Sequence, residues 1–401
     1  MKQIFHKTRR FLAKIWLELN PQLRIVGITG SYGKTNTTVA ITKVLSQKYP
    51  TIQTDLNLDT VFNLPITILK VKPWTEALIL EMGVDHPQEM DFHLSLVKPQ
   101  VGVLTGITPV HSDEEHLGSL EGIIEEKGKL LKSLPEDGLA VLNYDDENVR
   151  KMAKFSRAPV IFYGKNKKNC QIWADKIRVG LDNLQFELHD GQKVYKISTG
   201  LIGEHHVNTC MAAYAVGKFL GVPEEKIIFA LGKLTPLAGR LNIQKGPKDT
   251  FLLNDALRAN PASTIGGLIT LNQLPAKRKI VVLGEMGELG DFSEEGHRVV
   301  GKTIARIKID YLITVGPLTK YIIDSAVKSG FSSKKAFWAK NVKEAAKILE
   351  KILKKDDMIY LKGSLLRHME RIILILEGKK VRCDKVSCHF YKSCLTCPSL
   401  K

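Results

Sequence analysis

The pattern of apolar and polar residues along the chain predicts strands that alternate with helices. Stretches with apolar residues at helical spacing occur at 34–47 and 119–133. They separate short apolar runs of the kind that form buried strands, at residues 23–29, 77–83, 101–107 and 139–145. This alternation favours an α/β fold with a mostly parallel sheet in a central domain.

Two further parts of the pattern complete the expected fold. Residues 159–200 hold short runs broken by Gly, Asn and Asp, which predicts a small antiparallel insertion, and a helix is expected at 205–220. The alternation then restarts, which predicts a Rossmann-like α/β C-terminal domain. Its strands are expected at FLLND, KIVVLGEM, YLITVG and MIYLKGS, and its helices near 262–273, 294–308, 317–329 and 342–354. The expected boundaries are 23–238 for the central domain, 239–380 for the C-terminal domain and 381–401 for a Cys-rich tail.

The N-terminal segment, residues 1–22, predicts one basic amphipathic helix that Pro21 closes. Basic residues interrupt it before a signal-peptide core or a membrane span could form, so a cytoplasmic location is expected. Two roles remain open for the helix. It packs against the following domain, or it contacts the anionic head groups of a membrane surface.

Composition narrows the choice of partners only slightly. A chain of 401 residues with a net charge of +17 suits nucleic acid, an anionic membrane or phosphorylated substrates. No nucleic-acid-binding module is recognisable, so we expect no nucleic-acid partner, although a basic ATPase acting on nucleic acid stays open as an alternative. The spacing of the six cysteines does not resemble a secreted disulfide framework.

The segment GITGSYGKTNTT predicts a phosphate-binding loop between a strand and a helix. Ile28 stands where a strict Walker A pattern has its first glycine. Lys34 is expected to reach the β and γ phosphates, and the Thr35 hydroxyl to bind Mg²⁺. The residues expected to contact the nucleotide here are Gly30, Ser31, Gly33, Lys34, Thr35 and Thr37.

Three more residues are candidates for the chemistry near this loop. Glu81 ends an apolar strand, where an acidic side chain either anchors a metal ion or caps a turn. His111 follows the next strand, and Lys127 lies on the helix after that.

Many ordered motifs make the chain similar to the Mur ligase family, the ATP-dependent amide-bond ligases of cell-wall precursor synthesis, and within it to the D-alanyl-D-alanine-adding type. The resemblance runs from Gly27 to about residue 375. It rests on GITGSYGKTNTT, LNLDTVFNLPITIL, LEMGVDHPQEM, HLGSLEGIIEEKGKLL, VLNYDD, GEHHVNTCMAAYAV, NDALRANPAS, VLGEMGELGDFSEEGH and YLKGSLLRHME. The family's loop has the form TGSxGKT, which explains Ile28.

The resemblance implies roles for individual residues. Glu81, His111 and Lys127 would hold two Mg²⁺ ions, with Lys127 carbamylated by CO₂; a carbamate offers the anionic oxygens that hard cations prefer. His116 competes with His111 for this role. Further along, Asn208 would lie on the adenine side of ATP, and Arg240 with Asp255 would close on its phosphate and ribose. Lys362, Gly363 and Ser364 match a loop near the incoming amine, although a turn after a strand would use the same residues.

The chain departs from the family at both ends. Members of the family carry an N-terminal domain that binds the UDP portion of the precursor, and only about twenty residues precede the first strand here. Either another subunit holds the acceptor, or the acceptor lacks the UDP-sugar. At the other end, a site for Zn²⁺ or an iron–sulfur cluster and an unstructured tail are both open for Cys383, Cys388, Cys394 and Cys397.

The expected activity is that of a monomeric, ADP-forming carboxylate–amine ligase. The acceptor carboxylate would attack the γ-phosphoryl group of ATP, and an amino acid or a dipeptide such as D-alanyl-D-alanine would then attack the acyl phosphate. A folylpolyglutamate-type or other peptide ligase outside cell-wall synthesis is the alternative within the same class of enzyme.

Overall fold

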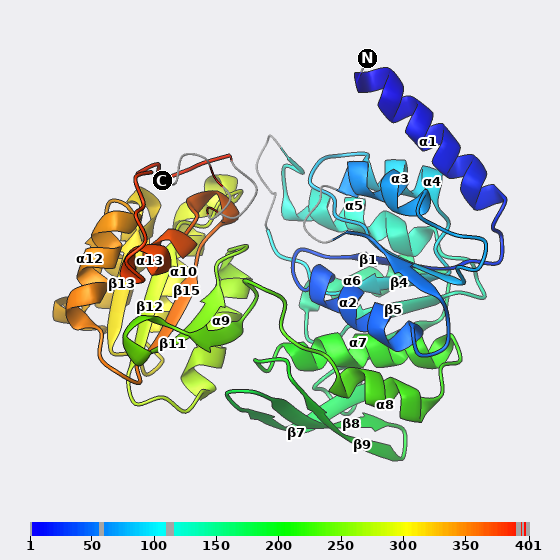
Figure 1. The fold of residues 1–401 in the computed structure, drawn as a ribbon. Coiled ribbons are helices and arrows are strands. Elements are labelled where there is room, and N and C mark those ends of the chain that lie inside the picture. The colour runs from blue at the N-terminus through cyan, green and yellow to red at the C-terminus, as the bar shows by residue number, and fades with distance from the viewer. Residues whose placement is uncertain (1, 56–59, 110–115, 390–393, 395–396, 398–401) are drawn as a thin grey trace. The chain divides into compact units, whose positions relative to one another are not determined.

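The computed structural model describes residues 2–55, 60–109, 116–389, 394 and 397. The chain forms two compact units, which are described separately. The first unit comprises Met1–Arg178, Leu184–Gly200 and His205–Thr235, and the second comprises Val179–Asn183, Leu201–Glu204 and Pro236–Lys401. Each unit has its own sheet (Figure 1). Each also has its own hydrophobic core.

The sheet of the first unit has nine strands in the order β2-β3-β1-β4-β5-β6-β7-β8-β9. The pairs from β2 to β6 are all parallel, as the sequence pattern predicted. The strands are β1 (Arg24–Thr29), β2 (Thr51–Gln53), β3 (Ala77–Glu81), β4 (Val101–Leu104), β5 (Leu139–Asn143), β6 (Val160–Gly164), β7 (Ile172–Val179), β8 (Leu184–Asp190) and β9 (Lys193–Thr199).

The antiparallel part of this sheet is smaller than expected from residues 159–200. β6 pairs in parallel with β5, and Tyr163 begins a short parallel pairing of β6 with β7. The helical segment after β5, which includes α6 (Glu147–Met152), supplies the long crossover that parallel pairing of β5 and β6 requires. β8 and β9 are antiparallel and joined by a tight turn, in which Gly191 has a positive φ of 60°.

The helices that the pattern predicted in the first unit are present, close to their expected positions. Those predicted at 34–47, 119–133 and 205–220 are α2 (Lys34–Leu45), α5 (Leu120–Lys132) and α7 (His206–Phe219). The pattern did not predict α3 (Thr60–Ile68), α4 (Glu89–Leu96), α6 or α8 (Glu224–Gly232). The N-terminal helix α1 (Lys2–Glu18) lies against α3 and α4 (Figure 1). Within the described ranges, none of the helices is long and apolar enough to cross a membrane.

The second unit is an α/β domain with a six-stranded sheet in the order β10-β11-β15-β12-β13-β14. Only the edge strand β10 is antiparallel to its neighbour. The strands are β10 (Asn242–Lys245), β11 (Phe251–Asp255), β12 (Lys279–Gly284), β13 (Tyr311–Val315), β14 (Ala336–Ala339) and β15 (Met358–Lys362). Its helices are α9 (Pro261–Gln273), α10 (Ser293–Ile304), α11 (Lys320–Lys328), α12 (Val342–Ile352) and α13 (Glu370–Leu376).

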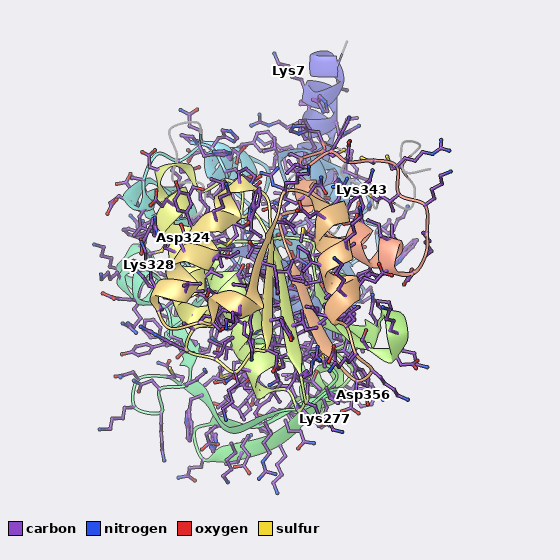
Figure 2. The ribbon with its side chains drawn as sticks, turned by 90° about the vertical axis from the view of Figure 1, so that its left-hand side faces the viewer. Lys7, Lys277, Asp324, Lys328, Lys343 and Asp356 are labelled. Carbon is purple, nitrogen blue, oxygen red and sulfur yellow. The ribbon has the colours of Figure 1, made fainter. Side chains whose placement is uncertain are left out.

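Helices cover both faces of the second sheet, as in a Rossmann-like domain. Asp324 and Lys328 on α11 lie on one face, and Lys343 on α12 lies on the other (Figure 2). Lys277 and Asp356 precede β12 and β15 and lie at the same edge, where the parallel strands begin (Figure 2). The carboxyl ends of these strands therefore share the opposite edge, where ligands bind in open α/β sheets.

Candidate active site

The phosphate loop connects β1 to α2, and two of its backbone positions require glycine. Gly30 has a φ of 147°, and a Cβ atom there would lie 2.2 Å from Thr105 Oγ1. Gly33 has a φ of 80° and precedes the first residue of α2. Residues other than glycine are strained at such positive φ values. The loop is thus shaped so that its backbone N–H groups and the N-terminus of α2 can face an anion.

The loop after β4 holds the phosphate loop in place. Ser31 donates a backbone hydrogen bond of 2.7 Å to Gly106 O, and its hydroxyl donates to Thr108 O at 3.1 Å. The Tyr32 hydroxyl donates to Asp146 Oδ2 at 3.0 Å. Thr37, also predicted to contact the nucleotide, is buried in the first turn of α2. The sequence had given no reason to assign a role to Asp146.

Lys34, Thr35 and Glu81 come together at the carboxyl end of the first sheet. The Lys34 ammonium donates to Gly30 O at 2.6 Å. Thr35 Oγ1 donates to Glu81 Oε1 at 3.4 Å, because β1 and β3 pair with Ile28 opposite Glu81. This contact supplies the partner for Glu81 that the sequence alone did not reveal. A hydroxyl and a carboxylate oxygen side by side fit Mg²⁺, which prefers hard oxygen ligands.

Lys127 is buried on α5 near this group of residues. Its side chain is 1% exposed, and its ammonium donates to Val84 O at 3.0 Å, just beyond β3. Burial, assisted by the positive charge of Lys34, lowers the pKa of the Lys127 amine to about 7. An amine with this pKa is about half neutral at pH 7, and CO₂ reacts only with the neutral form.

Carboxylates that the sequence analysis did not select surround Lys127. Asp85, Glu89 and Glu126 each act to raise the pKa of Lys127, against the effect of burial. Glu89 Oε2 accepts from the backbone N–H of Asp85 at 2.7 Å, and Glu126 Oε1 accepts from Met90 N at 2.8 Å. The signal for Asp85 and Glu89 was present in the segment VDHPQEM, which directly follows the strand that Glu81 ends.

The structure describes one of the two candidate histidines, His116, and does not describe the other, His111. His111 lies outside the described residues, so its role as a metal ligand stays a prediction. His116 is described, and its ring centroid lies 5.1 Å from that of His86. This contact does not decide between the two histidines.

Asn208 lies in the first turn of α7 and connects it to the end of β5. Its Nδ2 donates to Asp145 Oδ2 at 3.2 Å and reaches Asn143 Oδ1 at 3.5 Å. Asn143 in turn donates to Thr105 O at 2.8 Å, next to the phosphate loop. The position of Asn208 is therefore linked to the phosphate loop through two strand-end loops. Asn143 and Asp145, within LNYDD, are partners that the sequence analysis missed.

In the second unit, Asp255 pairs with Lys362 at the carboxyl ends of β11 and β15. Lys362 Nζ lies 2.6 Å from Asp255 Oδ2 and donates to Arg258 O at 2.8 Å, and the Tyr360 hydroxyl donates to the same carboxylate at 3.1 Å. Burial raises the pKa of Asp255, and the positive charges of Lys362 and Arg240 act against that shift. The sequence analysis had given Asp255 and Lys362 separate roles, whereas the structure joins them in one ion pair.

The segment Lys362–Ser364 is fixed against the loop after β12. Ser364 Oγ accepts from Gly287 N at 2.8 Å, and Ser364 N donates to Glu285 O at 3.1 Å. The space around Gly363 has no room for a side chain, because a Cβ atom at this position would lie 2.6 Å from Met369 Cγ. Two strand-end loops thus form one ordered surface, as a binding site for the amine would require.

The four tail cysteines are all described and free, but their sulfur atoms do not form one cluster among the described residues. Only Cys394 belongs to a group with other metal-ligating side chains, His368 and Glu370. Cys383 Sγ instead lies 3.4 Å from Arg371 Nη1. A metal site formed by the four cysteines stays a prediction that this arrangement does not favour.

These features define the class of protein. The glycine-dependent loop between a parallel strand and a helix, with the Thr35–Glu81 pair beside it, has the features of a P-loop that binds nucleotide phosphates. The second, Rossmann-like unit has the Asp255–Lys362 ion pair at the carboxyl edge of its own sheet.

Comparisons with known proteins agree with this class. Residues 28–217 match the Mur ligase middle domain, and residues 239–365 match the Mur ligase, glutamate ligase domain. The chain is 31% identical to the UDP-N-acetylmuramoyl-tripeptide--D-alanyl-D-alanine ligase of Bacillus subtilis over 90% of this chain and 77% of that protein.

Two solved structures extend the similarity to the fold. A crystal structure of MurF from Acinetobacter baumannii aligns with a TM-score of 0.84 at 26% identity, covering 93% of this chain and 81% of that one. MurF ligase from Thermotoga maritima in complex with ADP aligns with a TM-score of 0.80 at 25% identity, covering 93% and 84%. The chain belongs to the Mur ligase family, and its enzyme class is that of the ATP-dependent peptide ligases.

Proposed function

We propose that this chain joins D-alanyl-D-alanine, through its amine, to the carboxylate of a cell-wall peptide precursor, with ATP converted to ADP and phosphate. The observation that carries the proposal is the convergence of Lys34, the Thr35–Glu81 pair and buried Lys127 at one sheet edge. The relatives that cover most of the chain are named for this reaction, which supports the choice of substrates.

The reaction has two steps. A carboxylate oxygen of the acceptor attacks the γ-phosphorus of ATP, and the bond to ADP breaks, which leaves an acyl phosphate. The amine then attacks the acyl carbon, the bond to phosphate breaks, and the amine nitrogen loses its proton as the amide forms. Transfer of the phosphoryl group first makes the carboxylate oxygen a good leaving group.

The residues of the phosphate loop have distinct tasks in this scheme. The loop N–H groups and the Lys34 ammonium bind the phosphates and neutralise charge that develops during phosphoryl transfer. Thr35 and Glu81 offer hard oxygen ligands to Mg²⁺, which would supply further charge neutralisation. Asn208 is assigned to the adenine side of ATP, and Arg240 and Asp255 to its phosphate and ribose, on the family resemblance alone.

Lys127 is proposed to be carbamylated and, with Glu81 and His111, to hold two Mg²⁺ ions. The neutral amine attacks CO₂, a nitrogen–carbon bond forms, and a proton leaves the nitrogen. The burial of Lys127 supports this step because an ammonium is costly to bury, and the low pKa supplies the neutral amine. The carbamate replaces a positive charge next to Lys34 with a negative one.

The function is tested by measuring ATP-dependent phosphate release with a panel of acceptors and amines. We expect release that requires both a UDP-N-acetylmuramoyl-tripeptide and D-alanyl-D-alanine, with a product whose mass equals their sum minus one water. Release with a folate and glutamate would favour the folylpolyglutamate-type alternative, and release stimulated by polynucleotide alone would favour a nucleic-acid ATPase. Either result would contradict the proposal.

We also propose that α1 contacts an anionic membrane surface. One side of the helix packs on its unit through buried Ala13, and Trp16 Nε1 donates to Val71 O at 3.0 Å. Another side exposes apolar residues at helical spacing, including Phe11, 63% exposed, and Leu19, 67% exposed. An exposed apolar stripe flanked by basic residues is typical of helices that lie in the membrane interface. The exposed apolar and basic residues described on α1 are Lys7, Arg10, Phe11, Leu12, Lys14 and Ile15, and exposed Leu19 directly follows the helix.

Replacing both Phe11 and Leu19 with serine is expected to weaken binding to phosphatidylglycerol vesicles roughly tenfold or more, because two large apolar side chains no longer enter the bilayer interface. Vesicle co-sedimentation measures this. Val194→Ser, which removes an exposed apolar side chain from β9, is the matched control and should bind like the wild type. Equal binding by all three proteins, or no preference for anionic over zwitterionic vesicles, would refute the contact.

A further inference from the structure

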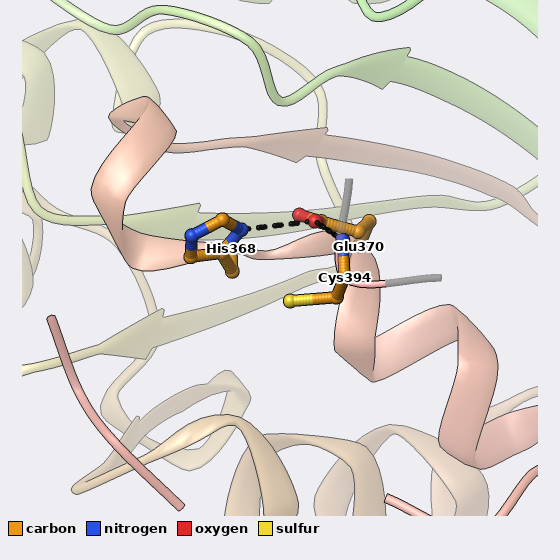
Figure 3. Close-up of side chains that lie close together, drawn as sticks. All are labelled: His368, Glu370 and Cys394. Atoms are coloured by element: carbon orange, nitrogen blue, oxygen red, sulfur yellow. Dashed lines mark hydrogen bonds and ion pairs between the residues drawn. The ribbon is translucent and has the colours of Figure 1, made fainter. Parts of the chain in front are cut away.

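A group of metal-ligating side chains lies outside the candidate active site, directly after the segment Lys362–Ser364. One ligand atom from each of His368, Glu370 and Cys394 lies within 4.8 Å of the others. His368 and Glu370 flank the start of α13, and Cys394 comes from the tail, so the group connects two segments distant in sequence (Figure 3). No residue of this group takes part in the ligase scheme described above.

His368 and Cys394 are shielded from solvent, the Glu370 side chain is 29% exposed, and both residues contact Glu370. The side chain of His368 is 1% exposed, and Cys394 is buried. His368 Nδ1 lies 3.1 Å from Glu370 Oε1, and the same oxygen accepts from Cys394 N at 3.2 Å (Figure 3). A metal ion among them would meet a ring nitrogen, a carboxylate oxygen and a sulfur atom, each from a side chain that is held by its neighbours.

Cys397 is placed to provide a fourth ligand. It follows Cys394 with two residues between, and its backbone N–H donates to Cys394 O at 3.0 Å. Cys394 forms a small buried cluster with Leu374, and Cys397 packs against this cluster. A Cys-x₂-Cys turn is a recurring half of structural zinc sites. Cys397 lies outside the 4.8 Å group, so ligation requires its sulfur atom to move toward Cys394.

The charges around the group balance when Zn²⁺ is bound. Two thiolates and one carboxylate with Zn²⁺ give a net charge of −1. Arg371 is fully buried next to the group and donates to His368 O at 3.2 Å and Lys385 O at 2.7 Å. Its guanidinium contributes +1, which brings the total charge of the ion, its ligands and Arg371 to zero. A buried charge that is compensated in this way costs far less than an isolated one.

We propose that His368, Glu370, Cys394 and Cys397 bind a Zn²⁺ ion that fixes the tail to the start of α13. Mixed nitrogen, oxygen and sulfur ligands in a four-coordinate set suit zinc, whereas Ca²⁺ and Mg²⁺ take oxygen ligands. An iron–sulfur cluster takes four thiolates or, in Rieske centres, two thiolates and two histidines, whereas this set contains two cysteines and one histidine. On binding, Cys394 and Cys397 lose their thiol protons to water as the two sulfur–zinc bonds form. The role is structural, because four protein ligands leave no open position.

Metal analysis of the full chain, purified without a metal-affinity tag and then incubated with ZnCl₂ and desalted, tests the proposal. We expect about one zinc per chain in the wild type, and a loss of most of it in Cys394→Ser and in His368→Ala. The matched controls are Cys383→Ser and Cys388→Ser, which should keep their zinc. Zinc-free wild-type protein would overturn the proposal, and so would zinc loss in the control variants, which would favour a site formed by the four cysteines.

Cobalt substitution keeps the test valid if a variant folds poorly. Co²⁺ bound to the wild type should give the visible bands of a tetrahedral site and a sulfur-to-cobalt charge-transfer band. In Cys397→Ser the charge-transfer band should weaken by about half, since one of two thiolates is lost. An octahedral Co²⁺ spectrum without a sulfur-to-cobalt charge-transfer band would contradict a zinc site.

Discussion

A Lys127→Ala variant is expected to lose roughly 100-fold or more of the ligase rate, because Lys127 is proposed as a direct metal ligand. Removing such a ligand should cost at least as much as the 10- to 100-fold typical of a residue that only hydrogen-bonds to a ligand. Added acetate should restore part of the rate. The alanine leaves space where the buried side chain lay, and a small carboxylate there would present the same oxygens as the carbamate. ADP formation at several acetate concentrations measures both effects.

Lys132→Ala is the matched control for this prediction, because Lys132 is exposed on the same helix. It should retain the wild-type rate and show no response to acetate. Carbamylation itself can be followed with ¹³C-labelled bicarbonate. The amine loses its proton as pH rises through its pKa of about 7, so the carbamate signal should increase from pH 6 to pH 8. A fully active Lys127→Ala variant, or a carbamate signal that persists in it, would refute the assignment.

A Lys34→Ala variant is expected to lose phosphoryl transfer, with turnover lowered by roughly 10²- to 10³-fold, as is typical when one preorganised charge-stabilising group is removed. Lys34 extends from the first residue of α2 back over the loop to Gly30 O, where its ammonium adds to the positive end of the helix. The loss should appear already in the first step. Acyl-phosphate formation, trapped by hydroxylamine or borohydride, measures this step separately from amide formation.

Lys43→Ala, an exposed position on the same helix, controls for a general effect of removing a lysine from α2. It should retain its turnover and the same yield of trapped acyl phosphate. If Lys34→Ala formed the acyl phosphate at the wild-type rate, the ammonium would have no part in phosphoryl transfer. The assignment of the phosphate loop would then need revision.

The sequence predicted those parts of the fold that local patterns determine. α2, α5 and α7 were found because each has apolar residues at helical spacing, and the phosphate loop because its glycines are needed for its backbone conformation. The short strands β2, β10 and β14 were missed, since three or four residues cannot show a period. β6 was expected in the antiparallel insertion because its direction depends on the crossover before it and not on its own residues.

The site was predicted less completely because its contacts are long-range. The sequence shows Thr35 and Glu81 separately, and only the pairing of β1 with β3 brings them together. Asp255 and Lys362 are 107 residues apart and meet through the pairing of β11 with β15. In the tail, the sequence left a site formed by four cysteines and an unstructured tail both open, whereas the fold places Cys394 beside His368 and Glu370. Local spacing carries no information about such partners.

The pairing of β1 with β3 also limits how this site could change during evolution. Successive side chains of a strand point to opposite faces, so insertion of a single residue before Glu81 within β3 would turn its carboxylate away from Thr35. Loops at the opposite edge of the sheet can change length without this effect. Relatives of this chain that keep the Thr35–Glu81 pair should therefore also keep the register of β3 against β1 up to Glu81.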